Sequence, residues 1–207
     1  LFVMSKKTLS LIRPPKLNSG DKVGVVAPAG PVDKQQLQNG LDVVSKMGFQ
    51  PILGRNVSFR SRFLAGTDLQ RAKDIMDMVR NPEVKAIFCA RGGYGTNRVL
   101  QYLDAKVIRA NAKIFVGSSD ITLLLHYLYL HCGMVGFHGP MVAGSFGRAP
   151  MNQSRKQFKN ILMGETSSLH CRKAKVFSKG IATGKITGGC LTLLCRSLGT
   201  PYEIQTR

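Results

Sequence analysis

The sequence predicts an α/β fold built on a parallel sheet. Short apolar runs typical of buried strands recur between residues 22 and 137. Segments with apolar residues at helical spacing lie between these runs, and the connecting loops are short. This alternation is typical of parallel strands joined by right-handed helical crossovers. We therefore expect a Rossmann-like or flavodoxin-like sheet in the N-terminal part of the chain.

The first elements follow from apolar pattern and capping residues. Residues 22–27 read as a strand, closed by the Pro-Ala-Gly-Pro run at 28–31. Asp33 can cap a helix that extends to about Lys46, because its apolar residues share one face. The second strand is expected at 49–53.

A second helix and a third strand come next. Thr67 is a good N-cap, and an Asn-Pro pair at 81–82 ends the helix that follows it. Residues 84–90 form a continuous apolar strand, which leads into the glycine-rich loop 91–95 and a short helix over 96–103.

The last repeats of the pattern lie between residues 114 and 140. A strand is expected at 114–116, a turn at Gly117, a helix over 121–130 and a final strand at 134–137. In parallel sheets, sites lie beyond the carboxyl ends of the strands. Four loops fall on that edge: 28–31, 91–95, 117–120 and 138–140.

The domain organisation is predicted from where this pattern weakens. We expect an N-terminal extension at 1–18, an α/β domain carrying the nucleophile at 19–147, a basic linker at 148–180 and the start of a truncated, β-rich α/β C-terminal domain at 181–207. A helix is expected near 152–163 in the linker, and 181–194 and 201–204 read as the opening elements of the last part.

Composition narrows the function classes. The formal net charge of +19 is typical of nucleic-acid-binding proteins, but the basic residues are spread out and no known nucleic-acid motif occurs. A basic nucleic-acid-associated protein therefore remains the alternative of a different class. No apolar run suggests a membrane span, and the five scattered cysteines lack C-x-x-C spacing, which favours a reducing, cytoplasmic compartment and no zinc. Cys89 reads as a buried free thiol.

Ser119 is the main candidate catalytic residue. It stands between an expected strand and an expected helix, after Gly117 and before Asp120. A serine on such a bend is exposed and lies near the free N–H groups of a helix start, which a nucleophile and an oxyanion both require. The alternative is that Ser119 or Asp120 only caps the helix, since both residue types are good N-caps.

The loop 91–95 (Arg-Gly-Gly-Tyr-Gly) has three readings. It can be a phosphate or dinucleotide loop, although it lacks the G-x-G-x-x-G spacing. It can supply backbone N–H groups to an oxyanion hole. It can also be a tight turn that needs positive φ at two positions. For Asp120 we expect a backbone N–H role, with its carboxylate free to cap the helix.

The four histidines are the candidate bases. His138 lies on the sheet edge that carries the loops, so it is the local candidate for a site-lining residue or a base. His126 and His131 lie further along the helix after Ser119 and read as packing or surface residues. His170 reads as solvent-exposed in the basic linker.

Seven blocks of the chain match one family in order: 20–30, 63–68 with 71–72, 90–95 with Arg98 and Leu100, 117 with 119–122, 137–141, 188–192 and 199–202. With these blocks the chain resembles the LD-carboxypeptidases, also called muramoyltetrapeptide carboxypeptidases, which have the microcin-immunity serine peptidases as relatives. The resemblance implies a serine peptidase that removes the terminal D-alanine from murein tetrapeptides during peptidoglycan recycling. It implies a Ser–His–Glu triad, an acyl-enzyme, no cofactor and no metal.

The resemblance also assigns residues. It places the nucleophile on Ser119 and the oxyanion-hole donors on the backbone of Asp120 and of Gly93. A murein tetrapeptide or related peptide is the implied partner, with no membrane, and the full-length form can be a homodimer.

The chain departs from the family pattern in three ways. Ser118 replaces a usually aromatic residue, and Cys190 replaces a usual asparagine. The family's triad glutamate and histidine come from beyond the block that ends at Tyr202, and Glu165 and Glu203 do not match that glutamate. We therefore expect a C-terminally truncated member, with an inactive fragment as the alternative function.

Overall fold

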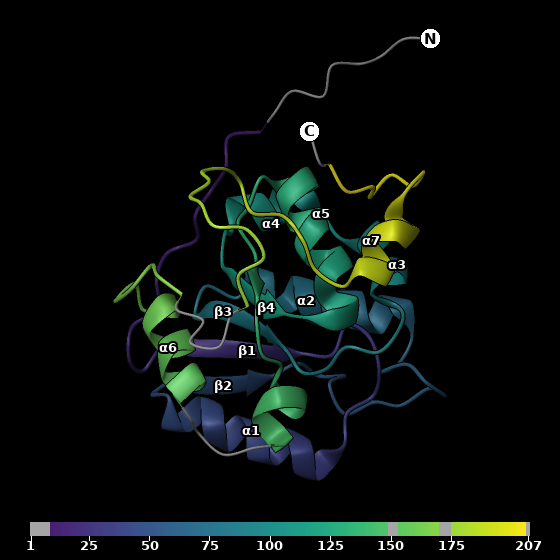
Figure 1. Cartoon of the computed structure of the whole chain (residues 1–207). Coiled ribbons are helices and arrows are strands. Elements are labelled where there is room, and N and C mark those ends of the chain that lie inside the picture. Colours follow the sequence, from purple (N-terminus) through teal and green to yellow (C-terminus); the bar gives the residue numbers. More distant parts are fainter. Residues whose placement is uncertain (1–8, 149–152, 170–174, 206–207) are drawn as a thin grey trace.

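The structure is a computed structural model that describes residues 9–148, 153–169 and 175–205 of the 207-residue chain (Figure 1). Its centre is a five-stranded sheet in the order β2-β1-β3-β4-β5, with every neighbouring pair parallel. The strands are β1 (Lys22–Val26), β2 (Gln50–Leu53), β3 (Val84–Cys89), β4 (Ile114–Gly117) and β5 (Phe137–His138). This is the flavodoxin-like order, so the predicted fold class is confirmed.

Four helices cover one face of the sheet. They are α2 (Asp68–Arg80), α3 (Thr96–Val99), α4 (Ala105–Ala110) and α5 (Thr122–Cys132). Their buried apolar residues form one core with Ile87 and Phe115 of the sheet. The predicted helix over 96–103 is divided, because a 3₁₀ turn (Leu100–Tyr102) follows α3. Helix α4, which begins after the Asp104 cap, was not anticipated from the sequence.

The other face is covered by α1 (Lys34–Lys46), a π-helical turn η3 (Val142–Phe146) and α6 (Gln153–Leu162). Helix α6 confirms the helix expected near 152–163, although it packs on the sheet face rather than lying in a basic linker. Phe158 and Leu162 belong to the core on this face, and the Phe158 ring lies 6.1 Å from that of Phe88 on β3. The periodic apolar residues, rather than the basic ones, therefore determine where this helix packs.

The predicted helix caps are confirmed. The Asp33 side chain accepts a hydrogen bond from the backbone N–H of Gln36 at 2.8 Å. Thr67 and Gln70 form a reciprocal capping box at the start of α2. Cys89 is fully buried as a free thiol, and burial raises its pKa.

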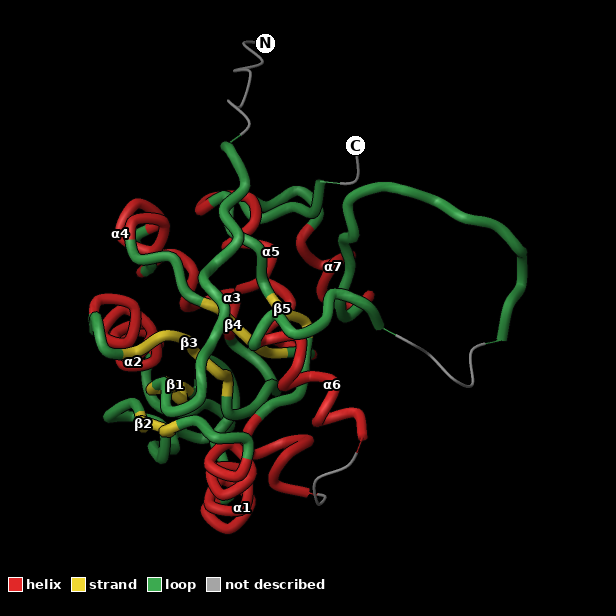
Figure 2. Tube along the Cα trace, turned by 90° about the vertical axis from the view of Figure 1, so that its left-hand side faces the viewer, coloured by secondary structure: helices red, strands yellow, loops and turns green. Residues whose placement is uncertain are grey.

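The C-terminal segment differs from expectation. The described residues after 138 contain no β-strand. Where the opening elements of a β-rich part were expected, the helix α7 (Leu191–Ser197) forms instead, and it packs against α5. Figure 2 shows the described parts of the segment between α6 and α7 reaching away from the sheet, and Phe177, Ile181 and Ile186 are almost fully exposed there. None of the helices within the described ranges has the length and apolar character needed to cross a bilayer.

Candidate active site

The loops after the strands meet at the carboxyl edge of the sheet, as the sequence predicted. The backbone N–H of Gly30 donates to the carbonyl of Gly92 at 3.1 Å, which joins the loops after β1 and β3. The backbone N–H of Gly139 donates to the carbonyl of Gly117 at 3.0 Å, which joins the loops after β4 and β5. The site is therefore built from adjacent strand ends.

Ser119 occupies a strained turn between β4 and α5. Its φ is +56°, and it is one of two non-glycine residues with positive φ in the described chain. Its side chain is exposed, and neither Ser118 nor Ser119 caps the following helical turn with its side chain. A serine whose backbone lies in the left-handed region, on a turn between a strand and a helix, has its hydroxyl exposed above the sheet edge. The capping alternative for Ser119 is therefore wrong.

Gly92 brings the glycine-rich loop close to Ser119. A Cβ placed on Gly92 would lie 3.0 Å from the Ser119 Cβ, 3.2 Å from its Oγ and 3.3 Å from the backbone nitrogen of Asp120, so a side chain here would crowd both residues. Glycine at this position therefore lets the loop backbone approach the serine and the Asp120 N–H group closely. Sequence reasoning did not single out Gly92, because the loop offered two adjacent glycines with no local signal to separate them.

Asp120 caps a helix, but a different one from that expected. Its buried carboxylate accepts a hydrogen bond from the backbone N–H of Thr96 at 2.9 Å, at the start of α3. The expectation that this carboxylate caps the helix after Ser119 is wrong, because α5 has no side-chain cap. The nucleophile turn is thereby tied to the glycine-rich loop.

The loop 91–95 is a tight turn of the expected kind. Gly93 and Gly95 have φ values of +124° and +106°, which confirms the expectation of two positive-φ positions. A Cβ on Gly93 would lie 3.2 Å from the backbone of Gly30, so the loop also approaches the β1 loop closely. Side chains other than glycine would therefore strain this turn.

Arg71 and Asp68 are site-supporting residues that the residue-by-residue reading missed. Arg71 is fully buried, and its Nη1 donates to the carbonyls of Pro28 and Gly95, the latter at 2.9 Å. Its Nη2 pairs with Asp68, which also accepts from Arg98 Nε at 2.9 Å. Burial lowers the pKa of Arg71, while Asp68 opposes that shift. The Thr-Asp-x-x-Arg spacing at 67–71 was the available signal.

The histidines take separate places. His138 is exposed on β5, in register with Gly117 of β4, so it lies on the site edge as expected. His126 is buried and its Nε2 lies 3.2 Å from the carbonyl of Gly188, whereas His131 Nε2 lies 3.2 Å from the carbonyl of Pro201. These two residues hold the C-terminal segment against α5, which confirms their packing role. His170 lies outside the described residues.

The described residues supply no acid–base partner to Ser119. Within them, the Ser119 Oγ forms no hydrogen bond with another side chain. Glu83 pairs with Lys22 at 2.9 Å, and Glu203 accepts from the backbone N–H of Gly199 at 2.7 Å. Nor do the described ranges contain three His, Cys, Asp or Glu side chains placed to hold a metal ion.

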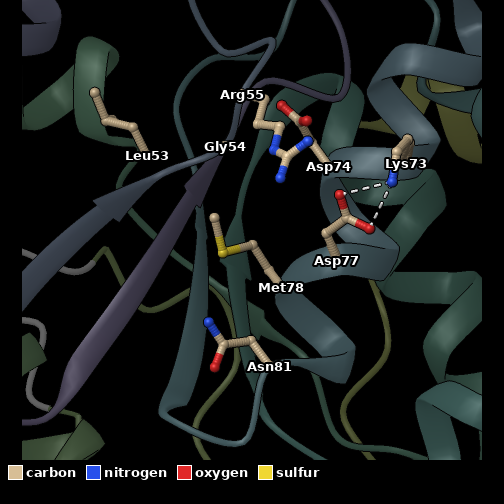
Figure 3. A pocket seen from close by; sticks show the side chains of 8 residues that line it. All are labelled: Leu53, Gly54, Arg55, Lys73, Asp74, Asp77, Met78 and Asn81. Atoms are coloured by element: carbon tan, nitrogen blue, oxygen red, sulfur yellow. Dashed lines mark hydrogen bonds and ion pairs between the residues drawn. The ribbon is translucent and has the colours of Figure 1, made fainter.

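A pocket of about 310 Å³ lies elsewhere, beside α2 and the end of β2 (Figure 3). Lys73 bonds both oxygens of Asp77 at 3.0 Å, and the Asp74 carboxylate accepts from Asn56 N and Nδ2 at 2.9 and 2.7 Å. Burial raises the pKa of Asp74. None of the predicted site residues lines this pocket, so its volume does not identify the site.

Comparison with known proteins gives matches over most of the chain. The sequence-family model that describes the LD-carboxypeptidase N-terminal domain matches residues 23–139 of this chain. The chain is 39% identical over 198 residues to the "Probable murein peptide carboxypeptidase" of Bacillus subtilis, covering 94% of this chain and 62% of that protein. It is 31% identical over 156 residues to the microcin C7 self-immunity protein MccF of Escherichia coli, covering 73% of this chain and 45% of that protein.

A solved structure shares the fold. The muramoyltetrapeptide carboxypeptidase of Oxalobacter formigenes matches with a TM-score of 0.77 and 30% identity, over 89% of this chain and 62% of that one. The chain thus spans less than two thirds of the length of each of these three proteins.

Proposed function

Because this chain belongs to the LD-carboxypeptidase family, we propose that it carries the nucleophile of a serine carboxypeptidase that removes the terminal D-alanine from murein tetrapeptides. The observation that carries the proposal is the exposed Ser119, which has a positive φ and lies against the glycine-rich loop at Gly92. The names of the Bacillus and Oxalobacter relatives support the substrate class.

The chemistry that this geometry supports is acyl transfer. The Ser119 Oγ attacks the carbonyl carbon of the terminal peptide bond, and its proton goes to a base. The tetrahedral oxyanion accepts hydrogen bonds from the backbone N–H groups of Asp120 and Gly93. The C–N bond then breaks, D-alanine leaves with a proton on its amine, and water hydrolyses the acyl-enzyme.

The base and its orienting acid are the missing part. His138 is the described histidine on the site edge, but no glutamate lies beside it to orient it. We propose that the triad histidine and glutamate belong to sequence beyond the part of the relatives that this chain matches. Peptidoglycan recycling in the cytoplasm is part of the same proposal, and the buried free thiols of Cys89 and Cys132 suit a reducing compartment.

An inactive, peptide-binding fragment is the second candidate. The observation in its favour is the absence of a base near Ser119 within the described residues. Without a positioned base a serine is a weak nucleophile at neutral pH.

One experiment separates the two candidates. The chain is joined to the part of the Bacillus subtilis relative that it does not match, and D-alanine release from a murein tetrapeptide is measured with and without Ser119→Ala. The enzyme proposal requires release that depends on Ser119 and a covalent acyl mass on the peptide containing it. A fusion that folds and binds the tetrapeptide but releases no D-alanine would favour the binding fragment.

A further inference from the structure

We propose that Arg71 is a positioning residue, which sets where the glycine-rich loop presents its N–H groups to Ser119. The inference rests on the proposed acyl-transfer function and adds a residue that never touches substrate. Arg71 lies near the start of α2, and its guanidinium reaches the loop after β1 and the glycine-rich loop after β3.

The contacts of Arg71 fix the glycine-rich loop at its far end. Arg71 Nη1 donates to the carbonyl of Gly95 at 2.9 Å and to that of Pro28. At the near end, the carbonyl of Gly92 accepts from Gly30 N. Gly93 and Tyr94 lie between these anchors, and the Gly93 N–H is the proposed oxyanion donor, so both ends of its loop are tied to the β1 loop.

The guanidinium is itself held in one direction. Arg71 Nη2 pairs with the Asp68 carboxylate, whose second oxygen accepts from Arg98 Nε at 2.9 Å. Both Asp68 and Arg71 lie at the start of α2, which the Thr67 capping box fixes. A planar guanidinium that bonds a carboxylate and two carbonyls determines angles as well as distances, which an ammonium cannot do.

Stability alone does not account for a charge at this position. Burying a guanidinium is unfavourable, and the Arg71 Nε has no hydrogen-bond partner among the residues described. Well-packed apolar residues often replace buried ion pairs without loss of stability. The geometry of the two loops is therefore the better reason for an arginine here.

A movement of the Gly95 backbone is transmitted to Ser119 through Thr96, Asp120 and the hydrogen bond between them. Thr96 follows Gly95, and its N–H donates to the Asp120 carboxylate at 2.9 Å. Asp120 in turn follows Ser119 and carries the second proposed oxyanion donor. Loss of the Arg71 contacts should therefore misplace both donors, and misplacement of about 1 Å can lower a rate about a hundredfold.

The test uses the 207-residue chain with Arg71→Met and Arg71→Lys. The matched control is Lys73→Met, which removes a charge from the exposed face of the same helix. Two readouts are taken: hydrogen exchange of the backbone amides of residues 93–96 in the chain, and the rate at which a fluorophosphonate probe at saturating concentration modifies Ser119 when the same substitutions are made in the fusion described above, which supplies a base. Addition of methylguanidinium to Arg71→Ala provides a rescue experiment.

We expect Arg71→Met to increase exchange at residues 93–96 at least about tenfold, with the amides of β1 and β3 unchanged. The saturating modification rate should fall at least about tenfold with little change in probe affinity, and methylguanidinium should restore it. Arg71→Lys keeps the positive charge but loses the planar guanidinium with its several N–H donors, so it should show the same changes to a smaller degree.

Loop exchange and modification rates equal to those of Lys73→Met would overturn the inference. If Arg71→Met does not fold, Arg71→Lys decides, and wild-type behaviour in both readouts again overturns it. If wild-type Ser119 is never modified in the fusion, where a base is supplied, the proposed function fails, whereas the exchange measurement on the chain still decides whether Arg71 positions the loop.

Discussion

The carboxylate of Asp120 accepts a hydrogen bond from the backbone N–H of Thr96 at 2.9 Å, across 24 residues of sequence. The bond is buried, and it joins the turn that carries Ser119 to the loop that carries Gly93. One side chain thus stabilises the helix start at Thr96 and fixes the distance between the two parts of the proposed oxyanion hole.

Replacing this carboxylate separates its two effects. Asp120→Ala leaves the buried Thr96 N–H without its acceptor, so the free energy of unfolding should fall by about 1–3 kcal/mol. Asp120→Asn keeps an acceptor oxygen and should lose less. Urea unfolding of both variants measures the difference, and equal losses for Ala and Asn would contradict the assigned hydrogen bond.

Ser119 should be replaceable without loss of stability. Its φ of +56° is unfavourable for serine and acceptable for glycine, so Ser119→Gly should raise the free energy of unfolding by up to about 1 kcal/mol. Ser119→Ala should leave folding nearly unchanged and abolish acyl-enzyme formation in the fusion described above. D-alanine release at the parental rate by Ser119→Ala would remove Ser119 from the mechanism.

Gly93 should act through its backbone. A Cβ there meets Gly30 at 3.2 Å and φ is +124°, so Gly93→Ala should misplace an N–H and cost about 3 kcal/mol of transition-state stabilisation. Gly184→Ala is the control, because nothing lies within 4 Å of a Cβ at that exposed glycine. The measurement is kcat/KM in the fusion, and unaltered turnover of Gly93→Ala would exclude this loop from catalysis.

The free energy of unfolding should rise with pH above about 8, because the buried Lys113 has a lowered pKa in the folded protein. Its Nζ is buried against the carbonyls of Met78 and Asn81, and desolvation with the charge of Lys85 lowers its pKa from 10.5 to about 8. Between these values the unfolded chain binds more protons than the folded one, so unfolding becomes less favourable as pH rises. Below the folded-state pKa of Lys113 the folded protein carries the full cost of burying its charged ammonium. Above 10.5, the pKa in the unfolded chain, that cost is absent.

The measurement is urea unfolding across this pH range for the wild type and for Lys113→Met. The wild type should gain on the order of 1–3 kcal/mol relative to the variant as pH rises. Parallel pH profiles for the two proteins would show that Lys113 is not the titrating group.

The 207-residue chain alone should lack LD-carboxypeptidase activity, since Ser119 has no positioned base among the described residues. The assay is D-alanine release from a murein tetrapeptide by the purified chain. Turnover comparable with that of complete relatives, lost in His138→Ala, would instead make His138 the base.

The sequence by itself determined most strands and helices of the sheet domain, and it placed Ser119 between a strand and a helix. Strand and helix periods, the caps at Asp33 and Thr67, and the position of Ser119 between β4 and α5 are local features. Each depends on neighbours within a turn or two, which the printed order of residues records directly.

The segments without a strong local pattern were predicted less well. The opening elements expected within 181–194 were not specified as a helix, yet α7 begins there, because short apolar runs fit either period and contact with α5 decides between them. Helix α6 was predicted near 152–163, but its packing on the sheet was not, because that packing depends on a sheet face that other residues build.

Only the tertiary structure decided how the site is assembled. Gly92 rather than Gly93 faces the Ser119 Oγ, Asp120 caps α3 rather than α5, and Arg71 bonds carbonyls 24 and 43 residues away. These contacts follow from the order β2-β1-β3-β4-β5, which places loops far apart in sequence at one edge. Local periodicity carries no information on that order, so the sequence located Ser119 on its turn, whereas the packed sheet determined what surrounds it.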